Sequence, residues 1–132
     1  MNLETNNHSV FSLNYHLILV VKYRRKVISD EISGRLREIF EAIQPAYHIT
    51  LQEWNHDRDH VHILFSAHPK SELSKFLNAY KSASSRKIKK EYPEIRTQLW
   101  KEFFWSRSFC LISTGGATNE IIRAYIERQG EK

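Results

Sequence analysis

The sequence predicts an α+β protein: a ferredoxin-like, RRM-like βαββαβ sandwich with one antiparallel sheet, two helices on one face of it, and an appended C-terminal helix. Three observations predict this fold. Four apolar or β-branched runs have the composition of strands. Two stretches with apolar residues three or four apart separate them in the order strand, helix, strand, strand, helix, strand. The 132 residues contain no repeat and no long linker, so we expect a single domain.

The first predicted strand and the first predicted helix occupy the N-terminal third. Residues 12–23 are β-branched and aromatic, and they are apolar on both faces, which is typical of a central strand. The next apolar residues follow helical spacing, with Ser29 or Asp30 as the N-cap and Pro45 after the end; they are Ile32, Leu36, Ile39, Phe40 and Ile43. This half of the sandwich therefore begins with a buried strand and an amphipathic helix.

Two further strands and a turn are predicted next. Residues 48–54 and 60–67 have strand composition, and residues 55–59, with the sequence NHDRD, predict an antiparallel connection between them.

The second half of the chain predicts a helix, a strand and a last helix. The helix covers about residues 71–91 and stops before Pro93, with apolar residues on one side and basic residues on the other. Residues 103–114 are predicted as the fourth strand. Gly115 and Gly116 then break the chain before a helix over residues 118–129.

Charge and composition limit the classes of partner and compartment. The net charge is +5, and it is concentrated at residues 22–26 (KYRRK) and 86–90 (RKIKK). Clustered Lys and Arg favour a polyanionic partner such as nucleic acid, with a solvated charged face as the alternative. Cys110 is the only cysteine, so no internal disulfide is possible. With no signal-peptide pattern and no long apolar run, we expect a cytoplasmic protein with no membrane partner.

Two histidines stand one residue apart in the predicted strand 60–67. Alternation along a strand puts His60 and His62 on one face, and Val61 and Ile63 on the other. If the apolar face meets the two packing helices, the histidines lie on the open face of the sheet. Neutral imidazole is the commonest protein metal ligand, so the pair allows a metal site. A chain of this length is too short for the eight-stranded barrels in which His-x-His also occurs.

The last predicted helix offers a third ligand and a nucleophile. Tyr125 and Gln129 are four residues apart and share one helical face. If Ile121, Ile122 and Ile126 dock this helix on the open face of the sheet, the Gln129 amide oxygen can complete a shell that suits Mg²⁺ or Mn²⁺ better than structural Zn²⁺. The Tyr125 phenol can then attack a phosphodiester polarised by the ion, and the covalent phosphotyrosine favours rejoining over hydrolysis.

These residues carry a family resemblance. His60-Val61-His62, Tyr125 to Gln129 (YIERQ), and the runs HSVFSLNYHLILVVKYRRK, DHVHILF, FWSRSF and STGGA resemble the single-tyrosine HUH-endonuclease transposases of small insertion sequences, the TnpA-like transposases of the insertion-sequence 200 type. The resemblance covers nearly the whole chain. It implies that His60, His62 and Gln129 bind Mg²⁺ or Mn²⁺, and that Tyr125 forms a 5′-phosphotyrosine on single-stranded DNA and frees a 3′-hydroxyl.

The resemblance also implies partners and a division of the chain. We expect single-stranded DNA with hairpin ends as the substrate, excision and insertion of the element, and a homodimer in which the tyrosine helix of one chain can complete the site of the other. We expect one HUH transposase domain over residues 1–132, with a core at 1–114 and a hinge and tyrosine helix at 115–132. Candidate DNA contacts are the basic residues Lys22, Arg24, Arg25, Arg86, Lys89, Lys90 and Arg107.

Each site residue also has a structural interpretation. The histidines could be half-exposed strand residues, Tyr125 a core aromatic and Gln129 a surface residue. Asp57 and Asp59 could orient a ligand histidine, but a turn-forming role is favoured. Phe104 and Trp105 could stack on bases, with core packing favoured, and His8, His56 and His68 are expected in loops.

Two other functions compete with the enzyme. An RNA-recognition domain shares the sandwich, but its Gly-aromatic-Gly/Ala-Phe signature is absent from the sequence. The alternative that remains is a catalytically silent module of the same fold that binds hairpins or single-stranded nucleic acid.

Overall fold

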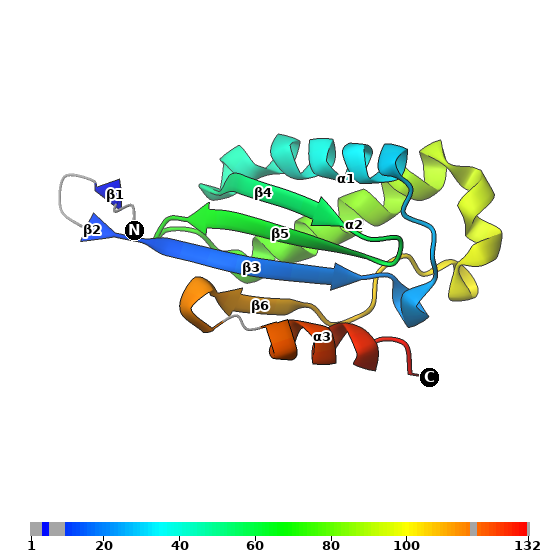
Figure 1. Cartoon of the computed structure of the whole chain (residues 1–132). Coiled ribbons are helices and arrows are strands. Elements are labelled where there is room, and N and C mark those ends of the chain that lie inside the picture. Colours follow the sequence, from blue (N-terminus) through cyan, green and yellow to red (C-terminus); the bar gives the residue numbers. More distant parts are fainter. Residues whose placement is uncertain (1–3, 6–9, 117–118, 132) are drawn as a thin grey trace.

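The computed structural model describes residues 4–5, 10–116 and 119–131 (Figure 1). A four-stranded sheet and two long helices form the body of the molecule, and a third helix packs on the sheet near the C-terminus. The regular elements are β1 (Glu4–Thr5), β2 (Val10–Phe11), β3 (Leu13–Val20), α1 (Asp30–Ile43), β4 (Thr50–His56), β5 (His60–Ala67), α2 (Leu73–Glu91), β6 (Cys110–Ser113) and α3 (Asn119–Arg128). Short 3-10 turns are η1 (Lys22–Arg24), η2 (Gln44–Tyr47), η3 (Pro93–Gln98), η4 (Trp100–Glu102) and η5 (Thr114–Gly116).

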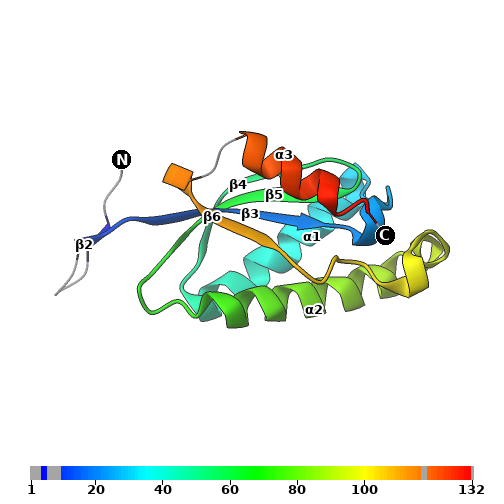
Figure 2. The same cartoon turned by 90° about the horizontal axis from the view of Figure 1, so that it is seen from below.

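The sheet has the strand order β4-β5-β3-β6, and all three pairings are antiparallel. Helices α1 and α2 cover one face, and α3 lies on the other (Figure 2). This order and layering confirm the predicted ferredoxin-like sandwich with an appended helix. Strands β1 and β2 pair in a separate two-stranded antiparallel sheet.

The main core fills the space between the sheet and helices α1 and α2. Leu17 and Leu19 of β3 are fully buried there, together with Phe40 of α1 and Tyr80 of α2. The Tyr80 hydroxyl donates a hydrogen bond of 2.9 Å to the carbonyl oxygen of Leu36, so the buried phenol is satisfied and the two helices are linked.

A second, smaller cluster lies on the opposite face of the same strand. Ile18 and Val20 of β3 and Cys110 of β6 are buried there, packed against Ile112 of β6 and three residues of α3: Ile122, Tyr125 and Ile126. Strand β3 is therefore apolar on both faces because helices cover both of them. Ile121 was expected to dock the helix with Ile122 and Ile126, but it is 48% exposed, whereas Ile122 and Ile126 are partly buried against this cluster.

The predicted helix boundaries hold closely. Ser29 is the N-cap of α1, and its Oγ accepts a hydrogen bond of 3.1 Å from the Ile32 amide. Helix α2 ends at Glu91, two residues before Pro93. His56, expected in a loop, is instead the last residue of β4.

The fourth strand is much shorter than predicted. Residues 103–109 lie outside any strand, and Trp105 makes only an isolated bridge to Val21. The reason is local: consecutive Phe104 and Trp105 are both buried, which strand alternation does not permit against a single core face. Trp105 donates a hydrogen bond of 2.9 Å to Ser84 on α2, so this segment is tied to the helix layer rather than to the sheet.

No helix in the described part of the chain is long and apolar enough to cross a membrane.

Candidate active site

Strand β5 separates apolar from polar side chains as its alternation predicts. Val61, Ile63 and Phe65 are fully buried under the two long helices, and His60 and His62 are half-buried on the face that carries α3. The register pairs His60 with Val20 and His62 with Ile18, and these two β3 residues lie in the apolar cluster under α3. The histidines therefore line the sheet beside the C-terminal helix.

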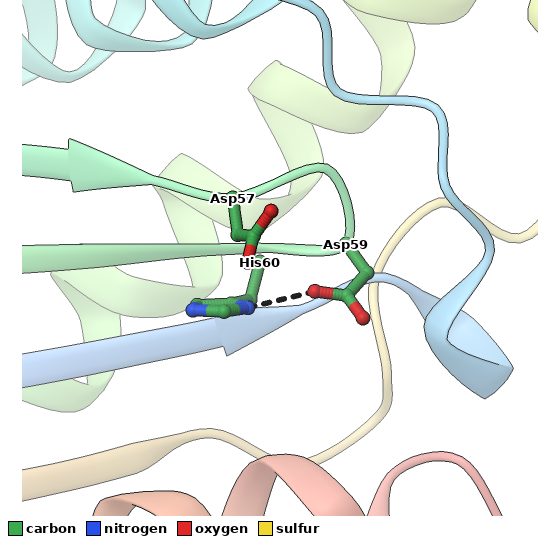
Figure 3. Close-up of side chains that lie close together, drawn as sticks. All are labelled: Asp57, Asp59 and His60. Atoms are coloured by element: carbon green, nitrogen blue, oxygen red, sulfur yellow. Dashed lines mark hydrogen bonds and ion pairs between the residues drawn. The ribbon is translucent and has the colours of Figure 1, made fainter.

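Asp59 orients His60. The Asp59 carboxylate is buried, with Oδ1 2.7 Å from His60 Nδ1 and Oδ2 2.9 Å from Arg24 Nε (Figure 3). Burial by itself would raise the pKa of Asp59, but the hydrogen bonds from His60 and Arg24 outweigh it and lower that pKa. The orienting role of Asp59, which the sequence interpretation ranked below turn formation, is thus the one that the contacts support, and it leaves Nε2 of His60 as the nitrogen open to a ligand.

Asp57, Asp59 and His60 form a cluster whose ligand atoms lie within 4.8 Å of one another, so it could hold a metal ion (Figure 3). Both oxygens of Asp59 already accept hydrogen bonds, and Asp57 Oδ1 accepts one of 2.7 Å from the Arg58 amide. Asp57 is exposed and caps the β4–β5 turn, as predicted. An ion at this cluster has to compete with these bonds.

His62 contacts a histidine that the sequence interpretation passed over. Nε2 of His62 lies 2.7 Å from Nδ1 of His16 on the neighbouring strand β3. The pKa of His62 is lowered, first by burial and then by the nearby His16 and His60. A lowered pKa keeps the imidazole neutral, which is the form that binds metals.

Tyr125 points its hydroxyl at Ser108. The two oxygens are 2.8 Å apart, and the ring of Tyr125 packs on the cluster formed by Ile18, Val20 and Cys110. Burial raises the pKa of Tyr125, and the hydrogen bond with Ser108 partly opposes this. In the part of the chain that the structure describes, no hydrogen bond joins Tyr125 to His60 or His62.

Lys81 of α2 holds the segment that carries Ser108. Its Nζ donates hydrogen bonds of 2.8 Å to the carbonyl oxygens of Ser106 and Arg107, and a longer one of 3.4 Å to that of Ser108. These bonds satisfy carbonyl groups outside the sheet and fix the backbone opposite Tyr125.

Gln129 follows the last turn of α3 and is half-buried. The backbone N–H of Gln129 donates hydrogen bonds to the carbonyl oxygens of Tyr125 and Ile126, so Gln129 continues the helical turn. The next residue, Gly130, lies against Arg24: a Cβ at this glycine would be 3.0 Å from the Arg24 Cδ. Because Arg24 bonds Asp59, the C-terminal end of α3 lies at the end of the sheet where His60 begins its strand.

The predicted basic contacts fall into separate groups. Lys22 and Arg107 line one cavity beside Trp100 and Phe103. Arg24 forms an ion pair with Asp59. Arg25 has a buried Nε without a hydrogen-bond partner among the described residues. The remaining three, Arg86, Lys89 and Lys90, lie on α2, on the far side of the sheet from the histidines (Figure 2).

Three residues of this region were missed from the sequence: His16, Ser108 and Lys81. His16 lies on the same face of β3 as Ile18 and Val20, which alternation along the strand could have indicated, but its contact with His62 depends on the strand register. Ser108 and Lys81 act through the irregular segment 103–109, for which the sequence carries no pattern.

Fold and sequence comparisons together place the chain among the transposases, enzymes that process DNA. Residues 9–129 match the family described as "Transposase IS200 like", and the chain belongs to this family.

Several relatives support this membership. The chain is 35% identical over 123 residues to the ISDra2 transposase TnpA of Deinococcus radiodurans. The matched region covers 93% of this chain and 88% of that protein. It is 25% identical over 125 residues to the transposase for insertion sequence element IS200 of Salmonella typhimurium, covering 95% and 82%.

Solved structures show the same fold. The crystal structure of a candidate transposase from Deinococcus radiodurans R1 superimposes with a TM-score of 0.87 at 30% identity, covering 98% of this chain and 99% of that one. A REP-associated tyrosine transposase bound to a REP hairpin superimposes with a TM-score of 0.57 at 12% identity, covering 94% and 68%, and that likeness concerns the fold alone.

Proposed function

We propose that this transposase cleaves and rejoins single-stranded DNA through a 5′-phosphotyrosine on Tyr125. The observation that carries the proposal is the position of Tyr125: its helix packs on the same face of the sheet that bears His60 and His62. Tyr80 is buried in the core, whereas Tyr125 is half-buried beside an exposed Ser108. Tyr125 therefore combines a fixed ring with access from solvent.

The chemical step is a transesterification. Tyr125 loses its phenolic proton and its oxygen bonds the phosphorus, while the bond from phosphorus to the 3′ oxygen breaks and that oxygen leaves as a 3′-hydroxyl. The phosphotyrosine keeps the energy of the diester bond, so attack by another 3′-hydroxyl rejoins a strand. This chemistry would support excision and insertion of an element.

His60, His62 and Gln129 would hold the divalent ion, Mg²⁺ or Mn²⁺. The bond between Asp59 and His60 Nδ1 favours this assignment, because it fixes the imidazole and leaves Nε2 for an ion. His62 meets the ion only if its contact with His16 opens or if His16 joins the ligands. When bound, the ion would polarise the scissile phosphate and stabilise the charge of the transition state.

The DNA and the partner chain complete the proposal. The substrate would be single-stranded DNA with hairpin ends, and a REP hairpin is what the more distant tyrosine transposase binds. The division of the domain would fall at Gly115, with Gly115 and Gly116 acting as a hinge between the core and the tyrosine helix. In this chain α3 packs on its own sheet, and in a homodimer the hinge would let it reach the partner's site.

A denaturing gel tests the enzyme. Labelled single-stranded DNA from the flanks of the locus is incubated with the protein in Mg²⁺ or in EDTA. We expect a labelled band at protein mass only with Mg²⁺, and none from Tyr125→Phe. DNA binding without a covalent band in any condition would instead establish the silent binding module.

A complementation assay tests the shared site. Mixed Tyr125→Phe and His60→Ala chains should regain part of the cleavage if α3 exchanges between subunits. Heterodimers that form but do not cleave would restrict each site to one chain.

A further inference from the structure

A cavity of about 330 Å³ lies next to the candidate active site and has a lining of aromatic and cationic side chains. We call it the Trp100 pocket, and its lining residues are Lys22, Trp100, Lys101, Phe103, Trp105 and Arg107. Three of these carry positive charge and three are aromatic, and none is acidic. We propose that the Trp100 pocket binds one unpaired nucleotide of single-stranded DNA, with the base against Trp100 and Phe103 and the phosphate near the three cations. This inference rests on the proposed function, because it names the part of the substrate that a second subsite takes.

The aromatic wall is preformed, and Phe103 is its exposed part. Trp100 and Phe103 are stacked, with ring centroids 5.9 Å apart and an angle of 24° between their planes. Phe103 is 55% exposed, although it is flanked by the buried Phe104. Exposed aromatic faces are the platforms on which proteins stack unpaired bases, and every base offers a π-face to them. The volume lies at the low end of the range for small-ligand sites, about 300–1,000 Å³, which suits a single nucleotide.

Cations surround this wall. Lys101 Nζ lies 4.6 Å and Lys22 Nζ 5.8 Å from the centre of the Trp100 ring, and Arg107 lines the same cavity from the irregular segment 103–109. Positive charge beside a stacking surface is the arrangement that follows a phosphate backbone in single-strand binding. Charge complementarity therefore favours a nucleotide over an apolar or a cationic ligand.

The backbone that shapes the pocket is held in an unusual conformation. Lys101 and Glu102 of η4 have φ of 49° and 62°, and Tyr23 and Arg24 of η1, the turn that begins at Lys22, have φ of 54° and 55°. None of the four is glycine, so both turns are locally strained. Strain of this kind persists where the surroundings hold it in place, and it is concentrated at binding and active sites.

Two residues of the pocket neighbour residues of the candidate active site along the chain. Lys22 is two residues beyond Val20, the partner of His60 in the sheet, and its amide donates a hydrogen bond of 2.9 Å to the Phe104 carbonyl oxygen. Arg107 immediately precedes Ser108, which contacts Tyr125. A strand whose phosphate lies at Tyr125 can therefore extend past Arg107 and place a neighbouring base in the pocket.

Fluorescence anisotropy with a fluorescein-labelled oligothymidylate tests the pocket, using the full chain with Tyr125→Phe so that no cleavage intervenes. Phe103→Ala should weaken binding about fivefold or more, the loss expected for one stacked base. Phe103→Tyr should retain the affinity, and Phe103→Leu should not, because leucine keeps the apolar volume but has no π-face. Phe11→Ala is the matched control, since Phe11 packs on His68 at the other end of the sheet and should leave binding unchanged.

The outcomes separate the pocket from the enzyme. Equal weakening by Phe103→Leu and Phe103→Ala, with duplex of the same length unaffected, supports the stacked base. Unchanged oligothymidylate affinity in Phe103→Ala, or an equal loss of affinity for the duplex, overturns the pocket. Covalent capture of DNA by the protein that keeps Tyr125 would then still support the proposed function. If the protein with no substitution binds no oligothymidylate and forms no covalent adduct with DNA, both proposals fail.

Discussion

Asp59 Oδ1 lies 2.7 Å from Nδ1 of His60, at the first residue of β5. The contact joins a buried carboxylate to a half-buried imidazole, and Arg24 holds the other carboxylate oxygen. An imidazole held in this way has a fixed ring plane and a fixed tautomer, with the proton on Nδ1. The metal-binding capacity of the site should therefore depend on Asp59 even if Asp59 never touches the ion.

Asp59→Asn should weaken Mn²⁺ binding by about 10- to 100-fold, which is the usual effect of losing a carboxylate that orients a ligand histidine. Isothermal titration with Mn²⁺ measures the affinity, and circular dichroism checks the fold.

Asp57→Asn is the matched control, because Asp57 is exposed and its side chain caps only the turn. Its Mn²⁺ affinity should stay within about twofold of the unsubstituted chain. If Asp57→Asn loses as much affinity as Asp59→Asn, the ion binds the cluster of Asp57, Asp59 and His60 instead.

His62→Ala should abolish metal-dependent cleavage while leaving the protein folded. The side chain lies on the α3 face and its removal leaves the main core untouched, so the melting temperature should change by only a few degrees, about 1 kcal/mol of unfolding free energy. Thermal unfolding and the covalent-capture gel are run together, with His68→Ala as the control. Full cleavage by His62→Ala would refute its assignment as a ligand.

Ser108→Ala should slow covalent capture by about 2- to 10-fold, since one hydrogen bond contributes about 0.5–1.5 kcal/mol. The bond with Ser108 opposes the effect of burial on the pKa of Tyr125, so its loss raises that pKa further and shifts the pH–rate profile to higher pH. Single-turnover rates across pH measure the shift, and DNA affinity should be unchanged. A profile that does not move would show that Ser108 has no influence on the phenol.

Tyr80→Phe tests the buried phenol between α1 and α2. Burial raises the pKa of Tyr80 well above its usual value of 10.0, so the unfolded chain releases this proton at a lower pH than the folded chain does. The free energy of unfolding should therefore fall as pH rises above 10, by up to about 1.4 kcal/mol per pH unit for this one group.

The substitution should cost about 1 kcal/mol at pH 7, because the bond to the Leu36 carbonyl oxygen is lost, and it should flatten the alkaline decline. Urea unfolding at several pH values measures both effects. An equally steep decline in Tyr80→Phe would mean that other groups cause it.

The strand and helix patterns predicted most of the fold because they depend on short-range periodicity. The alternation around His60 and His62 and the stripe along α1 were sufficient to predict which faces are buried. The segment 103–109 was not predictable in this way: Trp105 and Lys81 bond partners on distant elements, and its aromatic run resembles a strand.

For the candidate site, the sequence predicted which residue types share a surface but not their contacts. The pairing of His16 with His62 follows from the β3–β5 register, which single-strand patterns do not contain. Asp59 shows a second limit: a residue in a turn motif can also be buried, and only the tertiary structure reveals that Arg24 and His60 share its carboxylate.

The most direct test of the central claim is mass spectrometry of the covalently captured DNA. Trypsin cuts after Arg123 and Arg128, so Tyr125 is released in the peptide Ala124–Arg128, where it is the only tyrosine. After nuclease digestion in a Mg²⁺ reaction, we expect this peptide to carry a nucleotide linked through its 5′ phosphate to Tyr125. A nucleotide on another peptide, or cleaved DNA with no peptide attached, would contradict the assignment of Tyr125 as the nucleophile.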